Sequence, residues 1–304
     1  MSKLSFRSHI PILLSTLCIC SAFAQAAPAP AAAPVQPYTL PATEVQTLHA
    51  ANLKRDYEIY VSLPASYGQS QKTYPVVFIT DANYAFAVVR NISQFITRHD
   101  GNLQEFILVG LGYAKGDAPV DSRNRDYTPV AKAGSAPGDG KYGEVEAYRQ
   151  FVAAEVFPFV AHNYRADMSK KVFIGHSYGA LFGIHALLSE PAMFNAYILG
   201  SPSLWYGKHT MLDTERAYAA SKKDLPARVF MASGSFESVR PQAKSPRYNQ
   251  TNDLVKDMQA FEKQLKSRHY PGLSVHSEVV EGEDHVTVFP AIATHGLMWA
   301  LPAK

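Results

Sequence analysis

The chain has 304 residues, of which 47% are hydrophobic and only 18% are charged, a composition that is typical of a globular protein and excludes an intrinsically disordered one. Lys and Arg number 29 against 26 Asp and Glu, which gives a formal net charge of +3. This near balance, without any run of Lys and Arg interleaved with aromatic residues, argues against recognition of a nucleic-acid backbone.

Residues 1–24 have the three parts of a secretory signal peptide. Lys3 and Arg7 supply a basic start, residues 10–20 are apolar, and small residues suit cleavage near Ala24 or Ala26. The apolar run is shorter than the roughly 20 residues that span a bilayer, and an uncleaved membrane anchor is the alternative interpretation. We therefore predict export to the periplasm or beyond, with no stable membrane insertion after cleavage.

Cleavage of this leader would change the charge and the sulfur content of the chain. Loss of Lys3 and Arg7 would leave 27 basic residues against 26 acidic ones. Cys18 and Cys20 would also be lost, so the mature chain would have no thiol for a disulfide or a metal. Attraction of a charged ligand would then depend on a local patch of charge.

An Ala/Pro-rich segment follows at residues 25–37. Its four prolines cannot lie inside a helix, and it offers little apolar surface to bury, so we predict an extended linker. The folded body is expected to start near Tyr38 and to form one catalytic domain over residues 38–304.

Strand-like and helix-like segments alternate through this body. Residues 57–63 alternate with period two, as an antiparallel edge strand does. Short apolar runs rich in β-branched residues predict buried parallel strands at 76–80, 106–111, 171–174, 196–199 and 228–232, with a last strand at 273–275. Helical spacing predicts helices at about 85–97, 145–163, 179–188, 252–267 and 288–300. This alternation predicts an α/β fold with a mostly parallel, doubly wound sheet flanked by helices.

Residues 112–143 form the longest stretch without hydrophobic periodicity. They are rich in Gly, Pro and Asp and contain Arg123 and Arg125. A structureless segment of this length in a compact domain is usually functional, so we predict a long lid-like loop that overhangs the site.

Residues 175–179 read Gly-His-Ser-Tyr-Gly, which has the form G-x-S-x-G. The motif follows the strand at 171–174 and opens the helix at 179–188, the context of a nucleophile elbow. Side chains at 175 or 179 would collide with the neighbouring strand and helix, and the helix N-terminus favours developing negative charge. We predict Ser177 as the nucleophile; the alternative is a Gly-rich turn without catalysis.

A serine nucleophile needs a general base, and in the chain order Ser, Asp/Glu, His the base lies downstream. His285 lies in a turn between the last strand and the last helix, where it can reach the serine. His185 and His295 fall within predicted helices, and His269 and His276 flank a strand. We predict His285 as the base; the alternative is a surface-loop histidine.

The third member of the triad is expected to be an acid that orients the histidine. Glu237 follows the strand at 228–232, and catalytic groups collect at the carboxyl ends of such strands. Other downstream acids lie in a predicted helix or adjoin the histidine in sequence: Asp253, Asp257, Glu283 and Asp284. We predict Glu237 and keep another acid as the alternative.

Several segments between about residues 55 and 300 carry a family resemblance. They are Phe-Ile-Thr-Asp-Ala-Asn at 78–83, Arg-Asn-Arg-Asp-Tyr-Thr-Pro at 123–129, Glu-Val-Phe-Pro-Phe-Val at 155–160, Asn-Tyr-Arg at 163–165, the serine motif, Ser-Pro-Ser-Leu-Trp at 201–205 and Gly-Glu-Asp-His at 282–285. With them the chain resembles the esterase family of α/β-hydrolases, and most closely its ferric enterochelin (siderophore) esterase branch. The resemblance implies an α/β-hydrolase fold and hydrolysis of carboxylic esters through an acyl-enzyme. It also implies a catecholate siderophore tri-ester, or its ferric complex, as the preferred substrate.

The resemblance further implies an oxyanion hole. A loop that often reads Asp-Gly-Asn supplies one donor in such enzymes, and here the segment is Asp81-Ala82-Asn83. The implied donors are the backbone N–H groups of Asn83 and of Tyr178, which directly follows the nucleophile. Ala82 stands where the family usually has Gly.

Four residues are predicted to contact the substrate. Arg125, with Arg123 as second choice, is expected to pair with the negative charge of the ligand. Trp205 and Tyr84 are expected to line an aromatic pocket. The alternatives are an Arg125–Asp126 pair that only holds the loop together, and aromatic residues that only fill the core.

Three other functions stay open at this point. They are a general carboxylesterase, acyl transfer through the same acyl-enzyme, and a non-catalytic secreted binding protein on the same fold. No H-E-x-x-H pair or close His/Asp cluster with metal-ligand spacing occurs, so we predict no metal site and no cofactor. The expected partner is a small-molecule ester, and any iron would arrive bound to it.

Overall fold

The structure, a computed structural model, describes residues 37–99, 101–131 and 140–303. The chain divides into two units, Met1–Thr39 and Leu40–Lys304. The second unit begins close to the predicted start at Tyr38. The predicted signal peptide over 1–24 and all but the last residue of the predicted linker over 25–37 lie outside the described residues, so both stay predictions.

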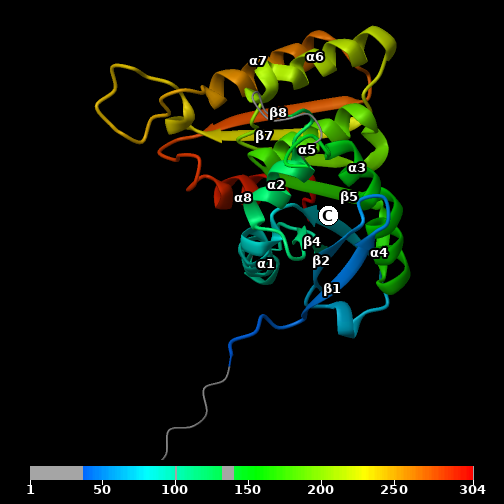
Figure 1. The fold of residues 1–304 in the computed structure, drawn as a ribbon. Coiled ribbons are helices and arrows are strands. Elements are labelled where there is room, and N and C mark those ends of the chain that lie inside the picture. The colour runs from blue at the N-terminus through cyan, green and yellow to red at the C-terminus, as the bar shows by residue number, and fades with distance from the viewer. Residues whose placement is uncertain (1–36, 100, 132–139, 304) are drawn as a thin grey trace, which may run out of the picture. The chain divides into compact units, whose positions relative to one another are not determined.

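The second unit is built on one eight-stranded sheet (Figure 1). In spatial order the strands are β1 (Thr43–Ala50), β2 (Arg55–Ser62), β4 (Ile107–Ala114), β3 (Tyr74–Ile79), β5 (Ala166–His176), β6 (Ala196–Gly200), β7 (Ala227–Gly234) and β8 (Leu273–Val280). The β1–β2 and β2–β4 pairs are antiparallel, and every pair from β4 to β8 is parallel. The predicted mostly parallel α/β sheet is therefore confirmed.

The position of the antiparallel edge differs from the prediction. The strand predicted over 57–63 is β2, but β1 pairs beyond it and forms the edge. Five of the eight residues of β1 are exposed, so its sequence lacks the apolar alternation by which a half-buried strand is found.

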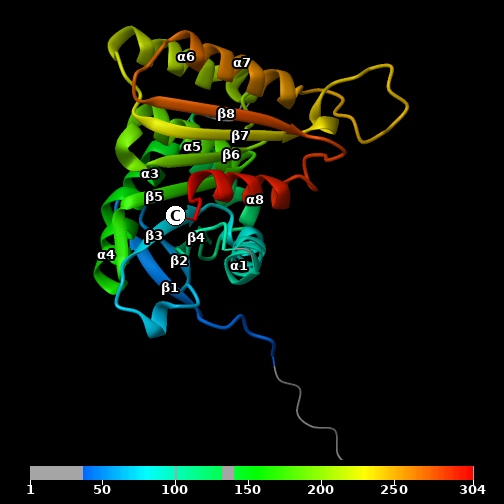
Figure 2. The same cartoon turned by 180° about the vertical axis from the view of Figure 1, so that it is seen from behind.

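Helices cover both faces of the sheet (Figures 1 and 2). One face carries α1 (Ala82–His99) and α8 (Phe289–Ala300). The other carries α2 (Pro119–Tyr127), α3 (Val145–Phe151), α4 (Phe157–Asn163), α5 (Tyr178–Ser189), α6 (Tyr206–Ser221) and α7 (Leu254–Ser267). Successive strand residues point to opposite faces, so Val76 and Phe78 join one hydrophobic core while Val77 and Ile79 join the other. Short elements complete the unit: η1 (Tyr67–Gln69), η3 (Pro191–Met193), η4 (Ser235–Glu237) and a π-helical turn, η2 (Val152–Val156), between α3 and α4.

The long lid-like loop predicted over 112–143 is wrong over much of its length. Strand β4 continues to Ala114, and α2 occupies Pro119–Tyr127; residues 132–139 lie outside the described residues. Helix α2 was missed because most of the side chains that it buries are polar, namely Ser122, Arg125 and Asp126 beside Tyr127. A helix of this kind has no hydrophobic period for a sequence to reveal.

Helix α6 was also missed. Three successive residues in its first turn, Gly207, Lys208 and His209, have positive φ angles of 58°, 57° and 64°. They interrupt the helical geometry, and the helix buries only Tyr206, Met211 and Glu215, so its sequence shows little apolar periodicity. Within the described part of the chain, every helix is too short or too polar to cross a membrane.

Candidate active site

Ser177 lies at the sharp turn between β5 and α5. Its φ of 58° and ψ of −115° are unusual for a residue other than glycine. The backbone N–H of Ser177 donates to the carbonyl of Gly200 at the end of β6 (2.9 Å), and the Leu181 N–H donates back to the Ser177 carbonyl (3.1 Å). Strand, neighbouring strand and helix together hold the strained turn, which lifts the hydroxyl above the carboxyl edge of the sheet.

Two glycines make this turn possible. A Cβ atom at Gly175 would lie 2.4 Å from the Gly179 carbonyl group, and one at Gly179 would lie 2.3 Å from Oγ1 of Thr80. The elbow can therefore approach both its own helix and the loop after β3 only if neither position carries a side chain.

Glu237 and His285 meet at the end of the neighbouring strands. Glu237 ends the turn η4 directly after β7, and its side chain is only 1% exposed. Its Oε2 lies 2.7 Å from Nδ1 of His285. Its Oε1 accepts hydrogen bonds from the Ser201 hydroxyl (2.6 Å) and from the Gly234 N–H (2.8 Å). The carboxylate is thus fixed on one side and directed at the imidazole on the other.

Three of the four other acids considered from the sequence are engaged elsewhere. Asp253 caps α7 by accepting from the Lys256 N–H (2.9 Å), and Asp257 pairs with His209 (3.1 Å). Asp284 accepts from the guanidinium of Arg247 at 2.9 Å. Burial acts to raise the pKa of Asp284, but hydrogen bonds from Arg247 and from nearby backbone N–H groups bring it below its ordinary value. Of the acids weighed from the sequence, only Glu237 is hydrogen-bonded to His285.

Ser177 and His285 line the same pocket, which has a volume of about 510 Å³. Its described walls are mostly apolar, with Tyr84, Val88, Val286, Phe289 and Pro290 beside the polar Arg123, His176, Ser177 and His285. Val286 is 83% exposed and forms an apolar rim directly after the histidine. A pocket of this size and lining suits a small organic ligand.

Arg123 is the one Lys or Arg among the described residues that line this pocket, and it joins two parts of the site. Its guanidinium makes two hydrogen bonds to Asp81 (2.8 and 3.3 Å), and donates to the carbonyl of His176 at 3.1 Å. It also lies over the ring of Tyr178, 5.2 Å from the centroid. Burial acts to lower the pKa of Arg123, but Asp81 more than offsets this and raises it, so the group stays charged.

Arg125, the first choice from the sequence, does not reach the pocket. It is 4% exposed, and its guanidinium pairs with Asp126 (2.9 Å) and Asp117 (2.6 Å) inside the fold. Asp126 also accepts from the hydroxyl of Tyr57 (3.0 Å). This geometry matches the alternative interpretation, in which the Arg125–Asp126 pair holds the segment in place, because both charges are already satisfied.

The implied oxyanion donors both lie in the first turn of a helix. Asn83 is the second residue of α1 and Tyr178 the first of α5, where backbone N–H groups have no acceptor within the helix. Asp81 precedes α1 with a φ of 58° and turns the chain after β3. Their assignment as oxyanion donors stays a prediction.

The two aromatic residues predicted to line the pocket differ in position. Tyr84 lines it, and its ring meets Phe289 edge-on with centroids 6.5 Å apart. Trp205 is partly buried beside Tyr178 and Tyr206, with centroids 6.2 and 6.0 Å away, and is not among the described lining residues.

His176 was missed by sequence reasoning, although it is the variable residue before the serine of the G-x-S-x-G motif. Its ring centroid lies 4.6 Å from that of His285, and its Nε2 is buried without a hydrogen-bond partner among the described residues. Burial holds the pKa of His176 well below its ordinary value, and the charges of His285 and Arg123 add to this effect. The wall beside His285 is therefore neutral.

Ser201 and Ser203 lie in the segment 201–205 that carries the family resemblance, and sequence reasoning assigned no role to either. Ser201 donates to Glu237, as described above, and Oγ of Ser203 lies 3.2 Å from Oγ of Ser177. They directly follow a buried parallel strand, where functional groups collect, and this position could have identified them from the sequence.

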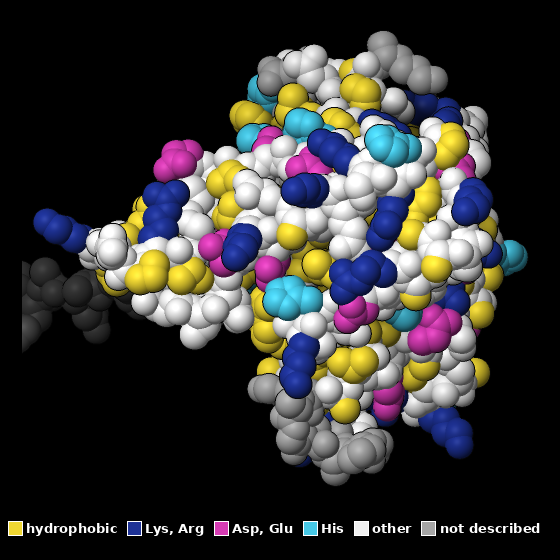
Figure 3. Space-filling model, turned by 90° about the horizontal axis from the view of Figure 1, so that it is seen from above, with side chains coloured by type: hydrophobic (Ala, Val, Ile, Leu, Met, Phe, Trp, Pro, Cys, Tyr) yellow, Lys and Arg dark blue, Asp and Glu magenta, His cyan; other side chains and the backbone are white. Residues whose placement is uncertain are grey.

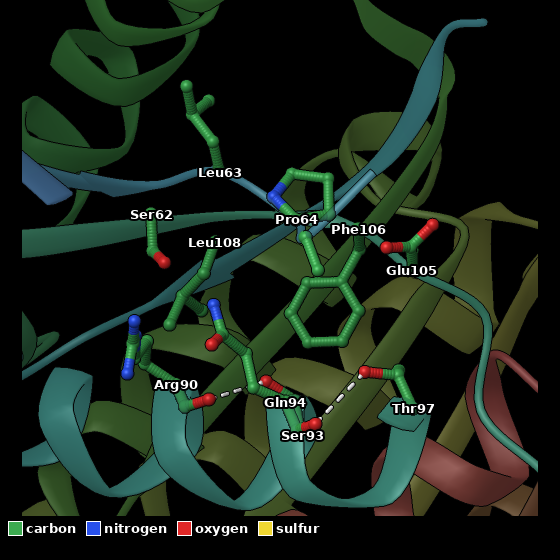
Figure 4. A pocket seen from close by; sticks show the side chains of 11 residues that line it. Ser62, Leu63, Pro64, Arg90, Ser93, Gln94, Thr97, Glu105, Phe106 and Leu108 are labelled. Atoms are coloured by element: carbon green, nitrogen blue, oxygen red, sulfur yellow. Dashed lines mark hydrogen bonds between the residues drawn. The ribbon is translucent and has the colours of Figure 1, made fainter. Parts of the chain in front are cut away.

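Among the described residues we find neither a metal site nor a second substrate-sized cavity near α1. In the described ranges, no three His, Cys, Asp or Glu residues are grouped to hold a metal ion. Figure 4 shows a cavity between α1, the end of β2 and the start of β4, lined by Ser62, Arg90 and Phe106 among others. Its volume of about 20 Å³ suits a water molecule and no larger ligand.

The family model and two known proteins that this chain resembles are described as esterases. The model of the family described as "Putative esterase" matches residues 50–292. The ferri-bacillibactin esterase BesA of Bacillus subtilis is 27% identical over 274 residues, covering 87% of this chain and 91% of that protein. The siderophore triacetylfusarinine C esterase of Aspergillus fumigatus is 25% identical over 256 residues, covering 79% and 87% of the two chains.

A solved structure supports the same fold. The siderophore hydrolase EstB from Aspergillus nidulans superimposes with a TM-score of 0.74 at 24% identity, covering 88% of this chain and 98% of that one. At this level of identity the likeness speaks for the fold alone.

Proposed function

The chain belongs to the esterase family matched over residues 50–292 and is an ester hydrolase; we propose that it is a serine esterase in which Ser177, His285 and Glu237 form the catalytic triad. The observation that carries this proposal is the buried Glu237 carboxylate, 2.7 Å from Nδ1 of His285 at the pocket that Ser177 also lines. A carboxylate in this position selects the tautomer with its proton on Nδ1 and leaves Nε2 free to act as a base.

The reaction follows from these groups. Oγ of Ser177 attacks the ester carbonyl carbon while Nε2 of His285 takes its proton, and a tetrahedral oxyanion forms. The C–O bond to the alcohol breaks, His285 protonates the leaving oxygen, and an acyl-enzyme remains. Water then attacks the acyl carbon with His285 again as base, and the acid and free Ser177 are released.

The oxyanion needs donors that are in place before it forms. We assign this role to the backbone N–H groups of Asn83 and Tyr178, in the first turns of α1 and α5. The dipoles of both helices favour negative charge at these ends. Arg123 connects the two donor segments, because it binds both Asp81 and the carbonyl of His176.

The substrate class that we propose is a siderophore ester, with a catecholate tri-ester or its ferric complex preferred. The relatives named above are described as esterases of siderophores. In this chain, the apolar wall of Tyr84, Val286 and Phe289 suits the faces of aromatic rings. Arg123 replaces Arg125 as the group that would meet an anionic oxygen, since it is the one that lines the pocket.

We further propose that the enzyme works in the periplasm or outside the cell. The supporting feature is the signal-peptide pattern of residues 1–24, followed by the Ala/Pro-rich segment 25–37 and a catalytic domain over 38–304. N-terminal sequencing of the exported protein should find a start close to Ala24, and a chain that retains Lys3 and Arg7 would contradict this location.

The substrate is tested by comparing hydrolysis across ligands. The protein is incubated with apo and ferric tri-ester siderophores and with p-nitrophenyl esters, and the products are resolved by mass. We expect cleavage of the siderophore esters with a higher kcat/KM than that of the p-nitrophenyl esters, and none by Ser177→Ala. Hydrolysis of the simple esters alone would leave a general carboxylesterase and refute the siderophore assignment.

A further inference from the structure

The segment Ser201-Pro202-Ser203 touches both ends of the proposed triad. It directly follows β6, which lies between the strand that carries Ser177 and the strand that leads to Glu237. All three residues are buried. The N–H of Ser201 donates to the carbonyl of Ala232 on β7 (2.7 Å), so the loop is fixed to the sheet at its start.

Ser201 contacts Glu237, the acid end of the triad. Its hydroxyl donates to Oε1 of Glu237 at 2.6 Å, and the Gly234 N–H donates to the same oxygen at 2.8 Å. A carboxylate only accepts hydrogen bonds, so the proton of Ser201 must point toward it. Two donors on Oε1 set the plane of the carboxylate and leave Oε2 for Nδ1 of His285.

The conformation of Ser201 favours a functional reason for this contact. Its φ of 41° is positive, although it has a side chain that disfavours such angles, and its exposed fraction is 0%. Strained conformations of buried residues persist where the surroundings hold them, and they cluster at functional sites. Here the strain brings the hydroxyl onto Glu237.

Ser203 contacts Ser177, the nucleophile end of the triad. Its Oγ lies 3.2 Å from Oγ of Ser177, and its N–H donates to the Ser177 carbonyl at 3.4 Å. A hydroxyl has one proton to donate and can accept two hydrogen bonds. If Ser203 donates to Oγ of Ser177, the proton of Ser177 is left to point at His285, which is the direction that proton transfer requires.

We propose that Ser201-Pro202-Ser203 is a single positioning loop, in which Ser201 orients Glu237 and Ser203 orients the hydroxyl of Ser177. Pro202 fixes its own φ and so limits how far the two serines can move relative to each other. The proposal rests on the proposed function, because it takes Ser177, His285 and Glu237 as the reacting relay.

The nucleophile end is tested with Ser203→Ala. Loss of the donor should lower kcat for a p-nitrophenyl ester about 10-fold and leave KM unchanged, since the hydrogen bond orients the nucleophile and does not bind the ester. Ser203→Cys keeps the size of the side chain with a much weaker donor and should show the same fall if the alanine variant does not fold. Wild-type kcat in the folded variant would overturn the role of Ser203.

The acid end is tested with Ser201→Ala, alone and combined with Glu237→Gln. A carboxylate that loses a donor stabilises a protonated imidazole more strongly, so the acid limb of the kcat/KM profile should move to higher pH. Because Ser201 acts through Glu237, the alanine change should add nothing in the Glu237→Gln background. An unmoved pH profile, or full additivity of the two changes, would overturn the role of Ser201.

Ser233→Ala is the matched control. Ser233 is a buried serine on β7 whose hydroxyl contacts the sulfur of Met258 at 3.4 Å. Its loss should leave kcat and the pH profile as in the wild type. Failure of the loop proposal is distinguishable from failure of the proposed function, since Ser177→Ala must lower kcat about 10⁴-fold or more if the triad is right, whatever the loop variants do.

Discussion

Ser177 and His285 are expected to act as a unit. The turn at Ser177 fixes the hydroxyl at the pocket, and the Glu237 carboxylate holds the imidazole at the same pocket. Ser177→Ala or His285→Ala should each lower kcat about 10⁴-fold or more, because either change removes the activated nucleophile. The double variant should be little worse than either single one. Steady-state kinetics with a p-nitrophenyl ester measure this, and near-wild-type turnover in either single variant would remove the triad.

Glu237 is buried and acts on the ester only through His285, so its loss should have a smaller effect. Glu237→Gln should lower kcat about 10²- to 10⁴-fold by favouring the wrong tautomer of His285. Asp253→Asn is the control, because Asp253 caps α7 and should affect stability alone. A larger kinetic loss in Asp253→Asn than in Glu237→Gln would show that the acid is wrongly assigned.

Arg123 has two proposed roles, binding of an anionic ligand and assembly of the site, and a comparison of two substrates distinguishes them. Arg123→Ala removes the bridge from Asp81 to the carbonyl of His176, so kcat on a small neutral ester should fall. If Arg123 also meets the ligand, kcat/KM on a ferric catecholate ester should fall about 10-fold further, as one charged hydrogen bond is lost. Equal losses on both substrates would restrict Arg123 to assembly of the site.

His176 makes the fold sensitive to acid. Burial holds its pKa well below the ordinary value, whereas an unfolded histidine binds a proton near pH 6.5. The unfolded state therefore binds more protons below about pH 6.5, and the contribution of this group to stability is lost as the pH falls. His176→Gln should reduce the drop in Tm between pH 7 and pH 5, measured by thermal melting. An unchanged drop would contradict this account.

At the level of elements, the sequence was most informative where burial and chain geometry act locally. Strand β5, the elbow and α5 were predictable because an apolar run, two required glycines and a helical period follow one another over residues 171–189. Helix α2 was not predictable, because the side chains that it buries are mostly polar and include the Arg125–Asp126 ion pair. Contacts such as Ser203 with Ser177 join residues from different strands, and no local pattern reveals them.

Helix α2 supplies a prediction at this scale. Arg125→Ala would leave the buried Asp126 without its ionic partner, and breaking such a pair costs about 3 kcal/mol or more of unfolding free energy. Kinetics on a small ester should change little in the protein that stays folded, since Arg125 does not line the pocket. Arg216→Ala, which removes an exposed pair with Asp213, is the control and should leave Tm nearly unchanged. An unchanged Tm in Arg125→Ala would contradict the structural role.

At the scale of the whole molecule, net charge is too small to steer an anionic ligand over a long distance. Lys and Arg side chains lie among Asp, Glu and His side chains on the face shown in Figure 3, and the full chain carries a formal net charge of only +3. Long-range steering of an anion should therefore be weak, and kcat/KM should depend little on ionic strength. Measuring kcat/KM for a ferric catecholate ester between low and high salt tests this, and a steep fall would reveal a basic field that the net charge does not indicate.

We propose above all that this sheet presents Ser177 as the nucleophile of an esterase. The most direct measurement is the site of covalent labelling by a fluorophosphonate, located by peptide mass analysis in the wild-type protein and in Ser177→Ala. We predict one adduct, on Oγ of Ser177, with loss of esterase activity in step with labelling and no adduct in the variant. Activity that persists after complete labelling, or an adduct on another residue such as Ser203, would contradict it.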